Sequence, residues 1–253
     1  IATLNELAPG RVVLGMGAGD RTPLDAVGME MGKPLAAVKE AIEMFRKLTN
    51  GEKVAFEGEV FKAAGAKLNF KPANKIPVYI GAQGPKMLEL AGKIGDGVLI
   101  NASHPSDIEY AVKMANEGMK QAGKSASDVD ITAYTSFSVN EDIKKAVKAA
   151  TPVVAFIVAG SPPPVLEKHK IDVAKADEIR SALKVGDFPK ALGAVTPEMI
   201  DVFSICGTPD VCIEKIAALQ KIGISQFVVG SPVGTNVKNA IDLIGSKIIP
   251  HFK

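Results

Sequence analysis

The feature that most constrains the fold is a serial alternation of short apolar runs with amphipathic helical segments. Each run is bounded by turn residues and is too short for a helix, as in strands buried on both faces of a parallel sheet. The predicted strands cover residues 11–16, 77–82, 97–101, 130–139 and 225–230. Apolar residues at helical spacing predict helices over about residues 34–48, 85–94, 106–122, from 141, from 208 and 236–249. Strand–helix units in series predict an α/β fold with a parallel sheet and right-handed crossovers.

The length of the chain then limits the architecture. A (β/α)8 TIM barrel normally takes about 250 residues, and this chain has 253. Excursions at about residues 51–75 and 160–198 use part of that length, so about five of the eight βα units are expected. Residues 1–253 are therefore predicted to form a single barrel domain that is incomplete at its N-terminus. Residues 1–10 agree with this prediction, because they read as the last turns of a helix and its stop.

Composition and charge exclude several classes of protein. The chain has 30 basic and 28 acidic residues, and this near-balance argues against a protein that binds nucleic acid or a membrane surface. No apolar run approaches the roughly 18 residues of a membrane span, and no signal peptide is visible. With only two cysteines, these features predict a cytoplasmic protein with reduced thiols. Cys206 and Cys212 are expected to pack in the core, and the wide spacing of His104, His169 and His251 predicts no metal centre.

A glycine-rich loop from Gly15 to Asp20 directly follows the first predicted strand. It resembles the G-x-G-x-x-G motif of dinucleotide-binding folds, but Asp20 stands where the third glycine belongs. The acidic residue expected about 20 positions later also falls inside a predicted helix. The favoured interpretation is a loop at the C-terminal rim of a barrel, where Asp20 faces a flat ligand. The alternative is a tight turn in which Asp20 is a solvated cap.

A second loop, Gly81-Ala-Gln-Gly-Pro-Lys86, joins a predicted strand to a predicted helix. Pro85 suits the first helical position, where no N–H is needed, and the free N–H groups and dipole at that end favour an anion. The glycines let a ligand approach the backbone, and Gly84 would also permit a positive φ. The pattern favours a phosphate cradle over a plain short loop. Lys86 is either a partner of the phosphate or a solvated helix residue.

Other candidate positions carry weaker signals. Asn101, at the C-terminal end of the third predicted strand, is a candidate ligand-binding residue on the presumed active face. The turn from Gly230 to Gly234 is a candidate rim loop of similar standing. Asp96, between two glycines, is interpreted as a turn residue. No Ser-His-Asp pattern or catalytic pair of carboxylates can be defended from the sequence.

Four segments together resemble the bacterial-luciferase-like superfamily of flavin- and deazaflavin-dependent enzymes. They are RVVLGMGAGD, GEKVAFEGEVFKAAGAKLNFKP, IPVYIGAQGPKMLELAGKIGDGVLI and GISQFVVGSP. The resemblance covers essentially the whole chain and is strongest to the F420-dependent methanogenic branch. It implies a luciferase-like (β/α)8 barrel that binds its cofactor at the strand C-terminal ends and commonly forms homo-oligomers. It also implies hydride transfer from reduced coenzyme F420 to methylenetetrahydromethanopterin, a pterin one-carbon substrate of methanogenesis, giving the methyl form.

The resemblance also implies roles for particular residues. Gly81, Ala82, Gln83, Gly84 and Lys86 would hold the phosphate of F420. Asn101 would add a cofactor contact, while Asp20 would be catalytic, assisting protonation or stabilising the cationic iminium form of the pterin. No metal is implied. The family's first three βα units would precede Ile1, and with them an acidic active-site residue and a non-proline cis peptide.

Three alternatives remain open on the same scaffold. One is a flavin-dependent luciferase-like monooxygenase with FMN as its cofactor. Another is an F420-dependent alcohol dehydrogenase. The third is a truncated, non-catalytic barrel that keeps at most a phosphate-binding loop.

Overall fold

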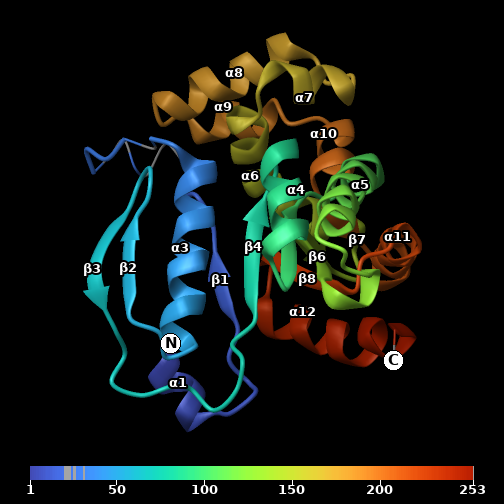
Figure 1. Cartoon of the computed structure of the whole chain (residues 1–253). Helices are drawn as coiled ribbons and strands as arrows, with labels where there is room; N and C mark the ends of the chain where they lie inside the picture. The colour runs from blue at the N-terminus through green and yellow to red at the C-terminus, as the bar shows by residue number, and fades with distance from the viewer. Residues whose placement is uncertain (20–23, 25–26, 31, 253) are drawn as a thin grey trace. The chain divides into compact units, whose positions relative to one another are not determined.

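The structure is a computed structural model that describes residues 1–19, 24, 27–30 and 32–252. Two compact units account for the chain (Figure 1). The first contains Ile1–Ile100 and Ala111–Ile131, and the second contains Asn101–Tyr110 and Thr132–Lys253. None of the helices in the described ranges has the length and apolar character of a membrane-spanning segment.

Three parallel strands form the sheet of the first unit. They are β1 (Leu14–Met16), β4 (Val78–Ala82) and β5 (Gly97–Asn101). Leu14 pairs with Val78, and Ala82 pairs with Ile100, so the strands are in register and their carboxyl ends share one edge. Burial alternates along β4, where Val78 and Ile80 are fully buried, which places β4 in the core of this unit.

Helices α1 (Ala2–Leu7), α3 (Pro34–Thr49) and α4 (Pro85–Ile94) belong to this unit, together with the last turns of α5 (Pro105–Gln121). Proline begins both α3 and α4, where its missing N–H costs nothing. α4 and α5 approach closely at two glycines. A Cβ on Gly92 would lie 2.0 Å from the Ala115 carbonyl oxygen, and one on Gly118 would lie 1.9 Å from that of Glu89. The helices can therefore pack at this distance only because both positions lack a side chain.

The first excursion is an antiparallel hairpin of β2 (Val54–Glu57) and β3 (Lys62–Ala66), followed by a segment that returns to β4. The hairpin contacts α3, and the buried carboxylate of Glu40 on that helix holds its turn. Glu40 accepts N–H bonds from Glu59, Val60 and Phe61, at 2.6, 3.0 and 2.9 Å. The bond from Phe61 is the main cause that keeps the Glu40 pKa below its usual value, while burial opposes it.

The second unit contains three more parallel strands. β6 (Asp130–Val139) pairs with β8 (Gln226–Val233) along most of its length and with β7 (Ile205–Gly207) at its carboxyl end. α11 (Pro209–Ile222) follows β7 and ends at Gly223, whose positive φ of 109° suits a helix C-terminus. α12 (Val237–Leu243) continues into a π turn (Ile244–Ile248) and a 3-10 turn (Ile249–Phe252).

The second excursion lies within a group of helices, labelled α6 to α10 in Figure 1. Their bounds are α6 Ile143–Gly160, α7 Pro163–Lys168, α8 Val173–Lys184, α9 Phe188–Gly193 and α10 Pro197–Phe203. Acidic N-caps start three of them: Asp142, Asp172 and Asp187 each accept a backbone N–H of the helix that follows. The helices bury a shared apolar core that includes Val154, Ile179 and Met199. This core explains how the segment from α6 to α10, in which the structure describes no strand, can fold.

Most predicted elements are confirmed, and four differ from the structure. The first strand begins at Leu14 and is not buried on both faces, because a Cβ on Gly15 would meet no atom of the described chain within 4 Å. β7 has no counterpart among the predicted strands. β8 continues to Val233, through what the sequence predicts to be a turn. The last helix keeps α geometry only to Leu243, and it continues as a π turn and then as a 3-10 turn that contains Pro250.

Candidate functional site

The predicted phosphate loop lies at the carboxyl end of β4. Gly81 and Ala82 complete the strand, and Gly84 is the N-cap of α4. Gly81 also lies close to the first glycine-rich loop: a Cβ on Gly17 would lie 3.9 Å from the Gly81 carbonyl oxygen, and one on Gly81 would lie 3.9 Å from that of Met16. Gly17, directly after β1, and Gly81, on β4, therefore place no side chains of their own at the edge where the two strands end.

The loop presents unused donors beside open space. Gln83, Gly84 and Lys86 are exposed, and within the described chain neither Gly84 nor Lys86 donates its N–H in a backbone hydrogen bond. A Cβ on Gly84 would meet no described atom within 4 Å. An anion at this point would meet N–H groups and the positive end of the α4 dipole. Gly84 does not use the positive φ that glycine permits, because its φ is −77° with ψ at 152°.

The other predicted site residues have different outcomes. Asn101 is exposed as the last residue of β5, directly after Ile100, which pairs with Ala82 of the loop strand. Asp20 lies outside the described residues. The predicted rim loop at residues 230–234 is wrong up to Val233, because these residues belong to β8. β8 packs closely against β6 at this point, since a Cβ on Gly230 would lie 2.2 Å from the Thr135 carbonyl oxygen of β6.

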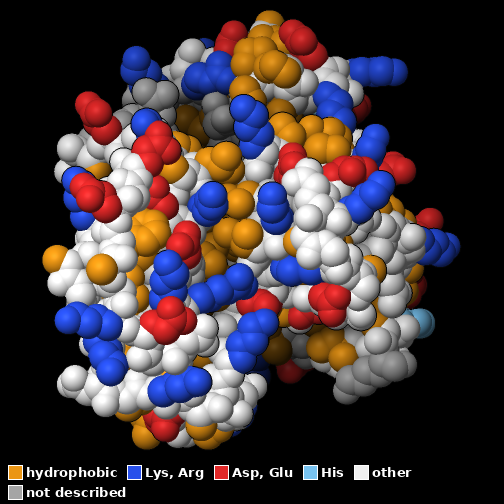
Figure 2. All heavy atoms as spheres, viewed as in Figure 1, with side chains coloured by type: hydrophobic (Ala, Val, Ile, Leu, Met, Phe, Trp, Pro, Cys, Tyr) orange, Lys and Arg blue, Asp and Glu red, His pale blue; other side chains and the backbone are white. Residues whose placement is uncertain are grey.

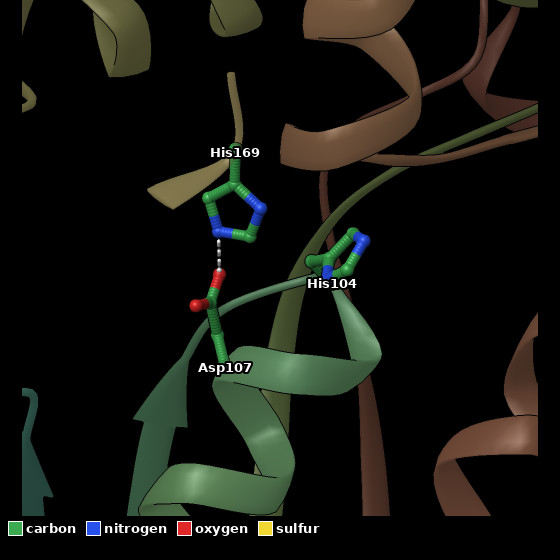
Figure 3. A group of neighbouring side chains, drawn as sticks. All are labelled: His104, Asp107 and His169. Atoms are coloured by element: carbon green, nitrogen blue, oxygen red, sulfur yellow. Dashed lines mark hydrogen bonds and ion pairs between the residues drawn. The ribbon is translucent and has the colours of Figure 1, made fainter. Parts of the chain in front are cut away.

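The structure brings together two histidines that are widely spaced in the sequence (Figure 3). The ring centroids of His104 and His169 are 4.6 Å apart, and His169 Nε2 is 2.8 Å from Asp107 Oδ2. His104 precedes α5, Asp107 is in its first turn, and His169 is the C-cap residue of α7. Sequence spacing gives no sign that these residues meet, because His169 lies 62 positions after Asp107 in the chain.

The donor atoms of this His104–Asp107–His169 cluster lie within 4.8 Å of one another, which is metal-ligand spacing. Each of the three residues, however, already has a polar partner in the protein. Asp107 also pairs with Lys168, and His104 Nδ1 is 2.8 Å from Ser106 Oγ and accepts the Ser106 N–H at 3.2 Å. Through these contacts the cluster connects the start of α5 to the end of α7.

The His104–Asp107–His169 cluster should make folding sensitive to mild acid. Burial, followed by the nearby His169, lowers the His104 pKa below its usual 6.5; Lys168 adds to this, while Asp107 and Asp201 oppose it. As pH falls through about 6.5, the unfolded chain gains a proton on this residue before the folded chain does. We therefore expect the free energy of unfolding to fall between pH 7 and pH 5.5 more in the unmodified protein than in His104→Asn. Urea unfolding at each pH measures this, and identical pH profiles for both proteins would contradict it.

The two cysteines are buried, which confirms that they pack in the core. Burial raises the pKa of Cys206 to about 11 and that of Cys212 to about 12. Thiols with these pKa values carry almost no thiolate at neutral pH, so they do not supply a nucleophile.

Comparison with known proteins places this parallel α/β fold in a family. The luciferase-like monooxygenase family matches residues 1–226, and the chain belongs to it. The fold is accordingly α/β of luciferase-like type with a mostly parallel sheet.

Three individual proteins show which kinds of family member this chain is similar to. The chain is 52% identical to the 5,10-methylenetetrahydromethanopterin reductase of Archaeoglobus fulgidus, over 100% of this chain and 77% of that protein. The solved coenzyme F420-dependent tetrahydromethanopterin reductase of Methanopyrus kandleri has 43% identity and a TM-score of 0.94, over 100% of this chain and 78% of that one. An F420-dependent secondary alcohol dehydrogenase, solved with an F420-acetone adduct, is 28% identical with a TM-score of 0.78, over 100% and 73% of the two chains.

Proposed function

We propose that this chain is an oxidoreductase that transfers a hydride from reduced coenzyme F420 to methylenetetrahydromethanopterin, giving methyltetrahydromethanopterin. The observation that carries this proposal is the 52% identity, across the whole chain, to the 5,10-methylenetetrahydromethanopterin reductase of Archaeoglobus fulgidus. A TM-score of 0.94 to an F420-dependent reductase supports it, against 0.78 for the alcohol dehydrogenase. The reaction belongs to the one-carbon metabolism of methanogenesis.

The loop at the start of α4 suits the phosphate of F420. It combines exposed glycine backbone, N–H groups at Gly84 and Lys86 that donate no backbone hydrogen bond within the described residues, and space in front of Gly84 that no described atom fills. Gly81, Ala82, Gln83, Gly84 and Lys86 would hold the phosphate, and Asn101 would add a contact at the end of β5. When bound, F420 supplies the hydride chemistry, while these residues bind and orient it.

The substrate side of the reaction needs a different kind of group. The iminium form of the pterin is cationic as it accepts hydride, so a carboxylate nearby would stabilise it. We assign that role to Asp20, which follows Gly19 at the end of the first glycine-rich loop. No buried carboxylate pair competes for the role in the described part of the chain, where Glu40 is the buried acidic residue and serves the hairpin.

Four broader features remain part of the same proposal. They are a (β/α)8 barrel, a single domain over residues 1–253, a homo-oligomeric state and a cytoplasmic location. The family resemblance and the βα order of the sequence support the barrel. Sedimentation of the purified protein would measure the oligomeric state.

The function is tested by following the deazaflavin absorbance of reduced F420 in the presence of the purified chain. We expect re-oxidation that requires methylenetetrahydromethanopterin and yields the methyl form in equal amount. The methyl product serves as the control substrate, because it cannot accept the hydride. Oxygen uptake with reduced FMN, or re-oxidation of reduced F420 by acetone in place of the pterin, would favour the alternative enzymes. Tight F420 binding without turnover would favour the non-catalytic alternative.

A further inference from the structure

A basic cavity lies in the first unit, at the opposite end of β4 from the Gly81–Lys86 loop. It has a volume of about 530 Å3, within the usual range of about 300–1,000 Å3 for small-molecule sites. The carboxyl end of α3, the segment before β4, the start of β5 and the turn after α5 form its walls. Figure 2 shows Lys and Arg side chains gathered on the face that carries the end of α3 and the start of β4.

The charges around this cavity do not balance. Arg46, Lys71, Lys75 and Lys124 line it, with Asp96 as the acidic lining residue. This gives a formal surplus of three positive charges, although the whole chain has a net charge of only +2. The cavity therefore concentrates positive charge that the remainder of the protein does not share. A local surplus of one sign in a concave site attracts small ions of the opposite sign.

The single negative charge of Asp96 cannot neutralise all four of these basic side chains. Its carboxylate accepts from Lys75, from Arg46 at 3.3 Å and from the Val78 N–H at 2.9 Å. Burial raises the Asp96 pKa, but hydrogen bonds from Lys75 and Val78 and the nearby cations outweigh it, so the pKa is lowered overall. Asp96 is thus an ionised anchor at the start of β5, and its single negative charge is shared between Lys75 and Arg46.

Donors remain available at the cavity wall. In the described chain, both hydrogen bonds of the Arg46 side chain come from Nη2, leaving Nε and Nη1 unused. Lys124 Nζ donates to the Gly95 and Gly92 carbonyl oxygens at 2.6 and 3.3 Å, which leaves one of its three protons. Lys71 has no ion-pair partner among the described residues and is exposed.

Repulsion between the cations is visible at Lys124. Burial lowers its pKa, and the charges of Arg46 and Lys75 lower it further, while Asp96 opposes them. A bound anion would relieve this repulsion and use the remaining donors together. Guanidinium and ammonium groups arranged around one pocket are the recurring partners of phosphate oxygens.

We propose that this cavity binds a phosphate-class oxyanion, either as free phosphate or as the end group of a small metabolite. The proposal concerns the end of β4 away from the predicted F420 loop and does not depend on the function proposed above. Val78 and Ala82 bound the strand, so the two sites lie at its two ends.

Titration calorimetry with inorganic phosphate and with glycerol 3-phosphate, at constant ionic strength in chloride, tests the proposal. We expect saturable binding of at least one of them; the two arms separate free phosphate from an esterified one. Lys71→Gln/Lys75→Gln should weaken that binding at least about tenfold, because two charges are lost while Arg46 and Lys124 keep their structural bonds. Both lysines are exposed, so the fold should persist, and a circular dichroism spectrum checks it.

The matched control is Lys113→Gln/Lys120→Gln, which removes the same charge from exposed positions of α5 in the same unit. It should bind phosphate as the unmodified protein does. Gly84→Val should also keep this binding, which distinguishes the cavity from phosphate bound at the F420 loop. Absence of saturable binding, or equal losses in the two double variants, would overturn the proposal.

Discussion

Gly84→Val is expected to weaken the binding of coenzyme F420 at least about tenfold, or about 1.4 kcal/mol. Gly84 is the N-cap of α4, and within the described chain the N–H groups of Gly84 and Lys86 donate no backbone hydrogen bond. A branched side chain would occupy the open space in front of it, where the phosphate is proposed to approach the helix terminus. The anion would then lose both hydrogen bonds and its favourable interaction with the helix dipole.

The same substitution should leave the fold intact, which makes the result interpretable. A Cβ at Gly84 meets no described atom within 4 Å, and the φ of −77° is accessible to valine. Binding is measured by fluorescence titration with F420 and with a deazaflavin analogue that lacks the phosphate. The analogue should bind both proteins almost equally. Equal losses for the two ligands would mean that the loop shapes the ring pocket, and the phosphate assignment would be wrong.

The sequence predicts the β4–α4 region well because its signals are local. Pro85 marks the first turn of α4, and the short apolar run before it marks β4. β7 is different: three residues suffice for a strand only because Ile205 pairs with Phe137 of β6. No local pattern in the sequence contains that pairing.

The candidate sites differ in the same way: a contiguous loop can be recognised in the sequence, whereas a site assembled from distant segments cannot. The Gly81–Lys86 loop is contiguous, so its glycines and its proline together indicate an anion site at a helix terminus from the sequence alone. The His104–Asp107–His169 cluster and the basic cavity are assembled from distant segments. Arg46, Lys75 and Lys124 each read as an ordinary surface charge in sequence, and their surplus appears only when the fold gathers them around Asp96.

Gly118→Ala should be among the most destabilising single-methyl changes in the described chain. A Cβ at Gly118 would lie 1.9 Å from the Glu89 carbonyl oxygen and 2.9 Å from the Lys93 nitrogen, which are backbone atoms of α4. A rotamer change cannot relieve contacts with backbone, so α4 and α5 must separate. Separation opens the interface where Leu88 and Ala115 are fully buried. We expect a loss of about 3 kcal/mol, the upper end of the usual cost of overpacking.

Gly160→Ala is the matched control, because Gly160 is also helical and a Cβ there meets no described atom within 4 Å. Alanine gains up to about 1 kcal/mol of helix propensity over glycine inside a helix, so propensity alone predicts stabilisation at Gly118 and a smaller gain at Gly160, the last residue of α6. Thermal unfolding should instead show Gly118→Ala melting roughly 6–12 °C lower, while Gly160→Ala stays level or rises. If both variants gained stability, the α4–α5 contact would be free to adjust, and close packing at Gly92 and Gly118 would not hold the first unit together.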